Sequence, residues 1–390
     1  MDSSTTVIHS ARVISDGRST PDSWVRFEGQ RIQSRGVDDA WRAETRPGDA
    51  VIDGSGRTLV PGFIDLHCHG GGGASVEDGS LAIERILDLH GAHGTTRSVL
   101  SLVTAPIDAL AARLETIAEV AATEPRVLGA HLEGPFLDRE FRGAHDPAFL
   151  RAADDGAVDE LLAAAGGVLR QVTIAPEHAG AASAIAHFID AGVVVAVGHT
   201  GADFATARRA FDAGASLLTH AFNGMRGIHH RAPGPVLAAL QCEHVTLEVI
   251  NDGVHVHPAV VSLAFASASG RIALITDAMA AAGSVDGAYR LGSLDVIVND
   301  GVARVADGGS IAGSTLTQDA ALRRAVADCG IALVDAVAAL TSVPAKAIGR
   351  GAELGRLEPG FAADAVLLTD DLEVDRVWAS GTQLFSAVLD

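Results

Sequence analysis

Two histidines separated by one residue end an apolar run near the start of the chain, in the segment Pro61–His69. Alternate residues of a β-strand face the same side, so His67 and His69 are expected to project together while Cys68 faces the other way. Two imidazoles on one side of a strand can bind one metal ion. Their place before the glycine run Gly70–Gly73 favours a metal site over a pair of unrelated surface histidines.

Four more residues with metal-binding or catalytic side chains also stand at the ends of apolar runs. Glu133 ends one such run, and three of the later runs are followed by His199, His220 and Asp277. In a parallel barrel the carboxyl ends of the strands converge on one face, where active sites form. We therefore interpret Glu133, His199 and His220 as metal ligands, with His67 and His69 as further ligands that a one-metal site would not need.

Asp277 has two interpretations. It can cap the N-terminus of a following helix, which is a common role for Asp after a strand. The run before it is wholly apolar and brings the carboxylate to the same face as the ligands, so we favour a catalytic role. His131, two residues before Glu133, is expected to point away from that carboxylate and to support the ligands indirectly.

The mixed nitrogen and oxygen ligand set suits zinc, although Fe²⁺ or Mn²⁺ also accepts imidazole and carboxylate. One or two ions per subunit are compatible with the number of ligands. Such an ion makes water reactive near neutral pH. Asp277 would take the proton of that water and pass it to a leaving amine, because an unprotonated amide nitrogen leaves poorly.

The elements that must hold these residues alternate along the middle of the chain. Helical patterns such as 203–213 and 258–267 lie between strand-like runs at 97–102, 126–132, 171–174, 193–197, 216–219, 245–250 and 271–276. Repeated strand–helix units predict a parallel α/β sheet, with a TIM-like (β/α)8 barrel as the leading arrangement and an open doubly wound sheet as the alternative.

Short strand-like runs with turn signals occur at both ends of the chain, for example at 23–27 and 374–379. We expect the two ends to form one small β-sandwich domain. The predicted domains are residues 1–58 (first part of the β domain), 59–352 (metal-dependent barrel) and 353–390 (second part of the β domain).

Composition limits the partners and the location. The 390 residues carry 29 basic against 49 acidic groups and a net charge of −20. Such a chain repels nucleic acid and anionic membranes, so neither is expected as a partner, and a phosphorylated substrate needs a local basic patch. Three cysteines, no signal peptide and no long apolar run predict a cytoplasmic protein without disulfides.

At these residues the chain resembles the amidohydrolase superfamily and, more narrowly, the N-acetylglucosamine-6-phosphate deacetylases. Nearly the whole chain takes part. The strings that carry the resemblance are Pro61–His69, His131–Phe136, Arg142–His145, Gly198–Thr200, Thr219–Met225, Asp252–His255, Thr276–Met279 and Ile311–Ser314. The His-x-His pair and the last Asp indicate only the superfamily, whereas Leu-Glu-Gly-Pro, Phe-Asn-Gly-Met and Asp-Gly-x-His point to the deacetylases.

The resemblance implies removal of acetate from N-acetyl-D-glucosamine 6-phosphate, in amino-sugar catabolism and cell-wall recycling. It implies a barrel with a small β domain, a homodimer, one ion on Glu133, His199 and His220, and Asp277 as the catalytic acid and base. Some members hold a second ion on the His-x-His pair. Because this chain has both His67 and His69, a two-ion site bridged by Glu133 is expected.

The resemblance also implies a set of substrate contacts: Ala144, His145, Asn223, Gly224, Arg231, His255, Ile311, Ala312 and Gly313. Arg231 lies in the densest cationic segment near the site, together with Arg226, His229 and His230. Guanidinium groups donate paired hydrogen bonds to phosphate, so Arg231 is the expected phosphate ligand, with a solvated basic loop as the alternative. In the family the counterpart of His255 can come from the partner subunit. The loop 137–141 has no assigned role and is a candidate lid.

Three alternative functions fit the sequence less well. Cyclic amidases such as dihydroorotases use a carboxylated lysine between two metals, but the only lysine of this chain, Lys346, lies in a helical pattern near the C-terminus. A nucleobase deaminase would lack the Leu-Glu-Gly-Pro carboxylate. A catalytically silent scaffold is disfavoured because every expected ligand and Asp277 are present.

Overall fold

The computed structural model describes residues 5–307 and 309–387. The chain divides into two compact units. The first comprises Met1–Asp65, Leu87–Arg97 and Gln318–Asp390. The second comprises Leu66–Ile86 and Ser98–Thr317. Within the described residues, no helix combines the length and the apolar character needed to traverse a bilayer.

A parallel sheet of eight strands, in the order β15-β14-β13-β12-β11-β10-β9-β6, nearly closes into a barrel. A parallel bridge between Cys68 and Ala278 joins the two ends of this order, and the Asp277 N–H donates to the His67 carbonyl at 2.8 Å. The predicted barrel is therefore confirmed over the open doubly wound sheet. Its strands are β6 (Phe63–Cys68), β9 (Thr95–Val103), β10 (Val127–Glu133), β11 (Leu169–Ile174), β12 (Val194–Val197), β13 (Leu217–Leu218), β14 (Thr246–Ile250) and β15 (Ile272–Ile275).

Helices follow the strands in chain order, as a barrel requires. They are α2 (Ser80–Ala92), α3 (Ile107–Ala121), α4 (Asp155–Ala165), α5 (Ala181–Asp190), α6 (Phe204–Asp212), α7 (Gly234–Leu240), α8 (Pro258–Ser267), α9 (Gln318–Ala327), α10 (Leu333–Leu340) and α11 (Ser342–Ala347). In α3 the buried residues are Ile107, Leu110, Leu114 and Ile117, whose spacing of three and four gives one apolar face. Asp154 caps α4 by accepting a hydrogen bond from the Ala157 N–H at 3.0 Å.

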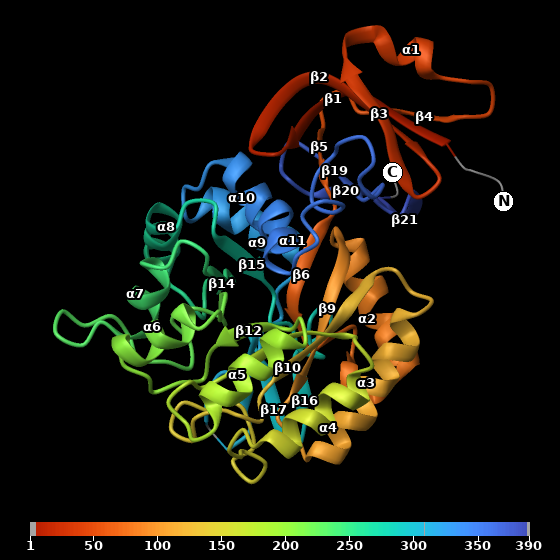
Figure 1. Ribbon diagram of the computed structural model, residues 1–390. Helices are drawn as coiled ribbons and strands as arrows, with labels where there is room; N and C mark the ends of the chain where they lie inside the picture. The colour runs from red at the N-terminus through yellow and green to blue at the C-terminus, as the bar shows by residue number, and fades with distance from the viewer. Residues whose placement is uncertain (1–4, 308, 388–390) are drawn as a thin grey trace. The chain divides into compact units, whose positions relative to one another are not determined.

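The two chain ends form one strand-rich domain, as expected, and its strands lie in one sheet, in the order β21-β20-β19-β5-β1-β2-β3 with β4 on β1 (Figure 1). The strands are β1 (Thr5–Ser15), β2 (Arg18–Glu28), β3 (Arg31–Val37), β4 (Ala50–Asp53), β5 (Thr58–Pro61), β19 (Ala365–Leu368), β20 (Val374–Ala379) and β21 (Thr382–Ser386), with the short helices η1 (Asp38–Ala40) and α1 (Trp41–Glu44). Phe27, Leu59 and Trp378 lie in its buried core. The domain boundaries at residues 58 and 352 remain a prediction.

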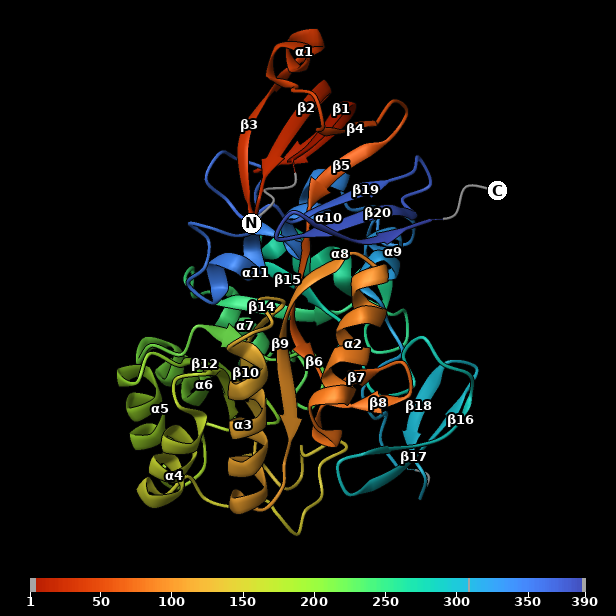
Figure 2. The same ribbon diagram turned by 90° about the vertical axis from the view of Figure 1, so that its right-hand side faces the viewer.

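An additional antiparallel sheet, which no sequence pattern predicted, follows β15 (Figure 2). It consists of β16 (Gly287–Leu291), β17 (Leu294–Asn299) and β18 (Val302–Val305). Leu291, Val296 and Val298 pack with Val103 and Met279 in one buried cluster. A small hairpin, β7 (Gly70–Gly71) with β8 (Ala74–Ser75), and the short helix η2 (Val76–Asp78) follow β6.

The barrel interior contains many polar side chains, whereas branched apolar residues usually dominate this position. His131 contacts the Ser101 hydroxyl through Nδ1 at 2.9 Å and the Thr173 hydroxyl through Nε2 at 2.8 Å. The hydroxyls of Thr173 and Thr219 are 2.8 Å apart. All four side chains are buried, so these hydroxyls hold His131 inside the barrel, and its indirect support of the ligands remains a prediction.

Candidate metal centre

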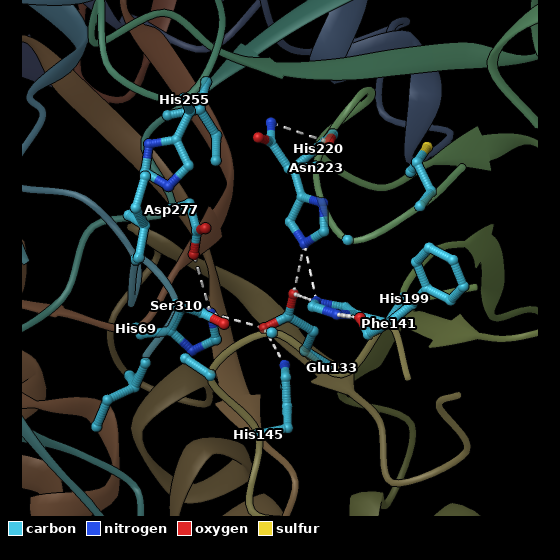
Figure 3. Close-up of a pocket in the computed structure, with 18 of the residues that line it drawn as sticks. His69, Glu133, Phe141, His145, His199, His220, Asn223, His255, Asp277 and Ser310 are labelled. Atoms are coloured by element: carbon cyan, nitrogen blue, oxygen red, sulfur yellow. Dashed lines mark hydrogen bonds and ion pairs between the residues drawn. The ribbon is translucent and has the colours of Figure 1, made fainter. Parts of the chain in front are cut away.

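Three of the predicted site residues stand at turns directly after their strands, in a backbone conformation that is unusual for them. His199, His220 and Asp277 have φ angles of 45°, 26° and 48°. Residues with a Cβ rarely adopt this left-handed region, and such strain concentrates at functional sites. The turns aim all three side chains at the same space over the strand ends (Figure 3).

Glu133 and two histidines form the first half of the centre. Glu133 Oε1 lies 3.0 Å from His199 Nε2 and 3.0 Å from His220 Nε2, and these two nitrogens are themselves 3.0 Å apart. His199 Nδ1 donates to the Phe141 carbonyl at 2.9 Å, because a carbonyl can only accept. In the neutral ring, Nε2 of His199 then presents a lone pair to Glu133 and His220.

The other half is built from His67, His69 and Asp277. The Nε2 atoms of His67 and His69 are 3.0 Å apart. Asp277 Oδ1 lies 3.3 Å from His69 Nε2 and 3.5 Å from His67 Nε2. These three residues form one group with the spacing of metal ligands. Glu133 joins the halves, since its Oε2 lies 3.1 Å from His69 Nε2.

The donor atoms of both halves fit divalent cations. Lone pairs that face one another at 3.0 Å repel unless positive charge lies between them, and tetrahedral zinc holds its nitrogen ligands about 3.3 Å apart. Burial lowers the pKa of His69, but Asp277 and Glu133 outweigh burial and raise it to about 9. Burial raises the pKa of Glu133, yet nearby histidines including His67 and His145 hold it well below its usual value. The carboxylates thus favour positive charge at this position.

A cavity of about 350 Å³ opens in front of these residues, within the usual range for small-molecule sites. Most of the substrate contacts implied by the resemblance line it: Ala144, His145, Asn223, Gly224, His255, Ile311 and Gly313. Ala312 is instead fully buried, and its N–H donates to the Ala303 carbonyl at 3.0 Å. Arg231 is not among the lining residues. It lies exposed on the 226–233 loop, with its Nη1 2.6 Å from His230 Nε2.

His145 is oriented by Thr104. The backbone N–H of Thr104 donates to His145 Nδ1 at 3.3 Å, so the ring proton is on Nε2, which lies 3.3 Å from Glu133 Oε2. Burial lowers the pKa of His145 to about 4, so the ring is neutral near neutral pH. His145 therefore presents an N–H donor to the cavity. Sequence reasoning missed Thr104, because no pattern links it to a histidine that is 41 residues away.

His255 has an acidic partner on its own turn. Its Nδ1 lies 2.6 Å from Asp252 Oδ2, and Asp252 Oδ1 accepts the N–H groups of Val254 and His255, each at 2.8 Å. Burial lowers the pKa of His255, but Asp252 outweighs it and the pKa rises. The cavity thus has an imidazole whose acidic partner favours its protonated form.

The loop 137–141, which had no assigned role, forms part of this wall. Phe141 lines the cavity and its carbonyl accepts the His199 proton. Asp138 shapes the loop, because its Oδ1 accepts the N–H groups of Glu140 and Phe141 at 2.8 and 3.1 Å. The loop therefore orients a candidate ligand and borders the cavity.

Residues 58–384 match the amidohydrolase family. The chain belongs to this family. Among curated relatives, N-acetylgalactosamine-6-phosphate deacetylase of Escherichia coli O157:H7 is 41% identical over 336 residues, which is 85% of this chain and 89% of the relative. N-acetylglucosamine-6-phosphate deacetylase of Vibrio furnissii is 35% identical over 84% of this chain and 83% of the relative.

Solved structures of deacetylases superimpose on this amidohydrolase over nearly their full length. A mutant N-acetyl-D-glucosamine-6-phosphate deacetylase from Mycobacterium smegmatis, in complex with N-acetyl-D-glucosamine 6-phosphate, superimposes with a TM-score of 0.92 at 40% identity, covering 98% of this chain and 100% of that one. The Pasteurella multocida deacetylase gives 0.92 at 27% identity and covers 97% and 99%. The resemblance stated from sequence is confirmed.

Proposed function

We propose that this amidohydrolase removes the acetyl group from N-acetyl-D-glucosamine 6-phosphate and yields acetate and D-glucosamine 6-phosphate. The observation that carries the proposal is the double cluster of ligand atoms joined by Glu133 at the wall of a sugar-sized cavity. The names of the relatives support the same reaction.

Glu133, His199 and His220 would hold one divalent ion, and His67 and His69 would hold a second ion beside Asp277. Zinc suits this nitrogen and oxygen set, with Fe²⁺ and Mn²⁺ as alternatives. Such ions supply Lewis acidity, which makes water nucleophilic at neutral pH and polarises a carbonyl.

Asp277 would move the proton. Burial raises its pKa, but the neighbouring His67 and His69 outweigh burial and lower the pKa to about 2, so the carboxyl is ionised. The carboxylate lines the cavity, so it can take a proton from the attacking water as the C–O bond forms. It then gives this proton to the sugar nitrogen as the C–N bond breaks, and the amine leaves neutral.

His145 would bind the acetamide oxygen or a sugar hydroxyl with its Nε2–H. A neutral ring is the appropriate donor here, because it adds a hydrogen bond without adding a competing charge beside the two ions. The Thr104 N–H fixes this tautomer from the far side of the ring.

Loss of the His-x-His pair should separate the one-ion and two-ion proposals. We expect His67→Asn/His69→Asn protein to bind one ion per chain where the parent protein binds two, because the Glu133, His199 and His220 atoms remain. Elemental analysis of dialysed protein measures this. A double variant that binds as many ions as the parent would exclude these histidines as ligands.

Phosphate recognition needs positive charge that the cavity supplies only in part. Within the described residues, the lining contains no Arg or Lys, and its imidazoles with a raised pKa are His255 and, at the metal centre, His69. We propose that Arg231 also reaches the phosphate, either from its own chain or from a second copy in a homodimer. The cytoplasmic location and the homodimer implied by the resemblance remain part of this proposal, and light scattering on the purified protein tests the dimer.

Arg231→Ala should lower kcat/KM for N-acetyl-D-glucosamine 6-phosphate by roughly 10- to 150-fold, the value of a hydrogen bond to a charged group. Activity on N-acetyl-D-glucosamine itself should change little, because that sugar has no phosphate. Arg208→Ala, which removes an exposed guanidinium paired with Asp212 on α6, is the matched control. Equal losses on both sugars would remove Arg231 from the phosphate site.

A second substrate is favoured by the 41% identical relative, whose name specifies N-acetylgalactosamine 6-phosphate. The two sugars differ only in the configuration at C4. Acetate release from both 6-phosphates and both plain sugars tests the function and ranks the epimers. We expect faster acetate release from the phosphorylated sugars than from the plain ones. Failure to release acetate from either 6-phosphate would refute the deacetylase proposal.

A further inference from the structure

A buried carboxylate lies behind the metal centre and has no role in the mechanism above. Glu248 is on β14, in the barrel, and its exposed fraction is 0%. A carboxylate that is removed from water needs hydrogen-bond donors and positive charge nearby. In the part of the chain that the structure describes, its ion pair is with His67, and neither Arg nor Lys pairs with it.

Two side chains hold this carboxylate in place. Gln171 Nε2 donates to Glu248 Oε1 at 2.8 Å, and His67 Nδ1 lies 3.4 Å from Glu248 Oε2. Gln171 and His67 are likewise fully buried. The amide donor fixes one carboxylate oxygen and leaves the other one directed at the imidazole.

The contact with Glu248 determines which ring nitrogen of His67 carries the proton. An ionised carboxylate only accepts hydrogen bonds, so the proton of His67 is on Nδ1. Nε2 then carries a lone pair on the side that faces His69 and Asp277. Histidines that bind metals commonly donate their other N–H to a carboxylate or a carbonyl, which fixes the ring and strengthens the ligand.

The other half of the centre has the same arrangement with a different acceptor. There the Phe141 carbonyl accepts the Nδ1 proton of His199. By contrast, the Nδ1 atoms of His69 and His220 are buried without a hydrogen-bond partner among the described residues. Each half therefore has one histidine whose ring is fixed from behind, and for the His67–His69 half that support is Glu248.

We propose that Glu248, held by Gln171, is a positioning residue that sets the affinity of the His67–His69 half for its ion. The inference rests on the two-ion form of the proposed function. Glu248 touches neither the cavity nor the reacting atoms, so it acts only through His67. Its loss is expected to empty this half while the Glu133–His199–His220 half stays filled.

The test is metal binding by Glu248→Leu, which keeps the size of the side chain and removes the acceptor. Metal-depleted protein is titrated with Zn²⁺, and bound zinc per chain is counted. We expect the first ion to bind as in the parent and the second ion to bind at least about 10- to 100-fold more weakly, the usual effect of removing such a partner. Thr173→Val, which removes a buried hydroxyl of the same barrel interior, is the matched control and should bind two ions.

Glu248→Gln keeps the result interpretable should the leucine variant fail to fold. Its amide oxygen can still accept from His67, so its second-ion affinity should lie between those of the parent and the leucine variant. Parent-like binding of two ions by a folded Glu248→Leu protein would overturn the proposal, and so would an equal loss in Thr173→Val. Acetate release by the parent is measured in parallel, so failure of the deacetylase function is seen separately from failure at Glu248.

Discussion

Asp277→Asn is expected to bind metal as the parent does and to release acetate at least roughly 10³-fold more slowly, within the range for losing a general acid–base group. The asparagine keeps the shape of the side chain and one acceptor oxygen, so the contacts with His67 and His69 need not rearrange. It cannot take a proton from water or give one to the amine. The effect should therefore appear in kcat with little change in KM.

Steady-state kinetics and elemental analysis on the same preparation check this prediction. Asp252→Asn is an informative comparison, because that carboxylate pairs with His255 and lies away from the double cluster. We expect it to affect binding of the phosphorylated sugar more than the chemical step. Turnover by Asp277→Asn near the parent level would show that Asp277 is not the group that transfers the proton.

Glu133→Gln is expected to lose both metal ions. It should lower kcat/KM by roughly 10³- to 10⁴-fold, since metal-ion catalysis contributes several kcal/mol. Glu133 is the group that both halves share, with Oε1 at 3.0 Å from His199 and His220 and Oε2 at 3.1 Å from His69. The amide has no negative charge to offset two cations. Its NH₂ group would also direct protons at one pair of histidine nitrogens.

The measurement is bound metal per chain after dialysis, followed by acetate release. Glu140→Gln is the matched control, because Glu140 also lines the cavity but is exposed and is not in either ligand group. It should retain two ions and most of the activity. Two ions bound by Glu133→Gln at parent affinity would contradict the bridging role.

Much of the centre was predictable because strand geometry is local and regular. The alternation of a strand places His67 and His69 on one side, and the carboxyl ends of parallel strands meet at one face. Those two rules bring Glu133, His199 and Asp277 together without any knowledge of the loops. The barrel itself followed from repeated strand–helix units, and the predicted strand 374–379 coincides with β20.

Other features were not encoded in a local pattern. The sheet β16–β18 was missed because it interrupts the alternation of strands and helices along the barrel. Arg231 stood out as a cation in a loop, but the described chain leaves it exposed and outside the cavity lining, since loop paths depend on packing that spacing does not reveal. Phe141 entered the site through its backbone carbonyl, which any residue type could have provided.

The sequence by itself determined which residue types stand at the strand ends, and hence the family and the class of chemistry. Only the tertiary structure decided how each ring is turned and supported. Thr104 fixes the tautomer of His145, and Glu248 faces His67 from a strand 181 residues away. The physical reason is that a metal ligand or proton donor is defined by which nitrogen carries the hydrogen. That choice depends on a partner brought close by folding and not by position along the chain.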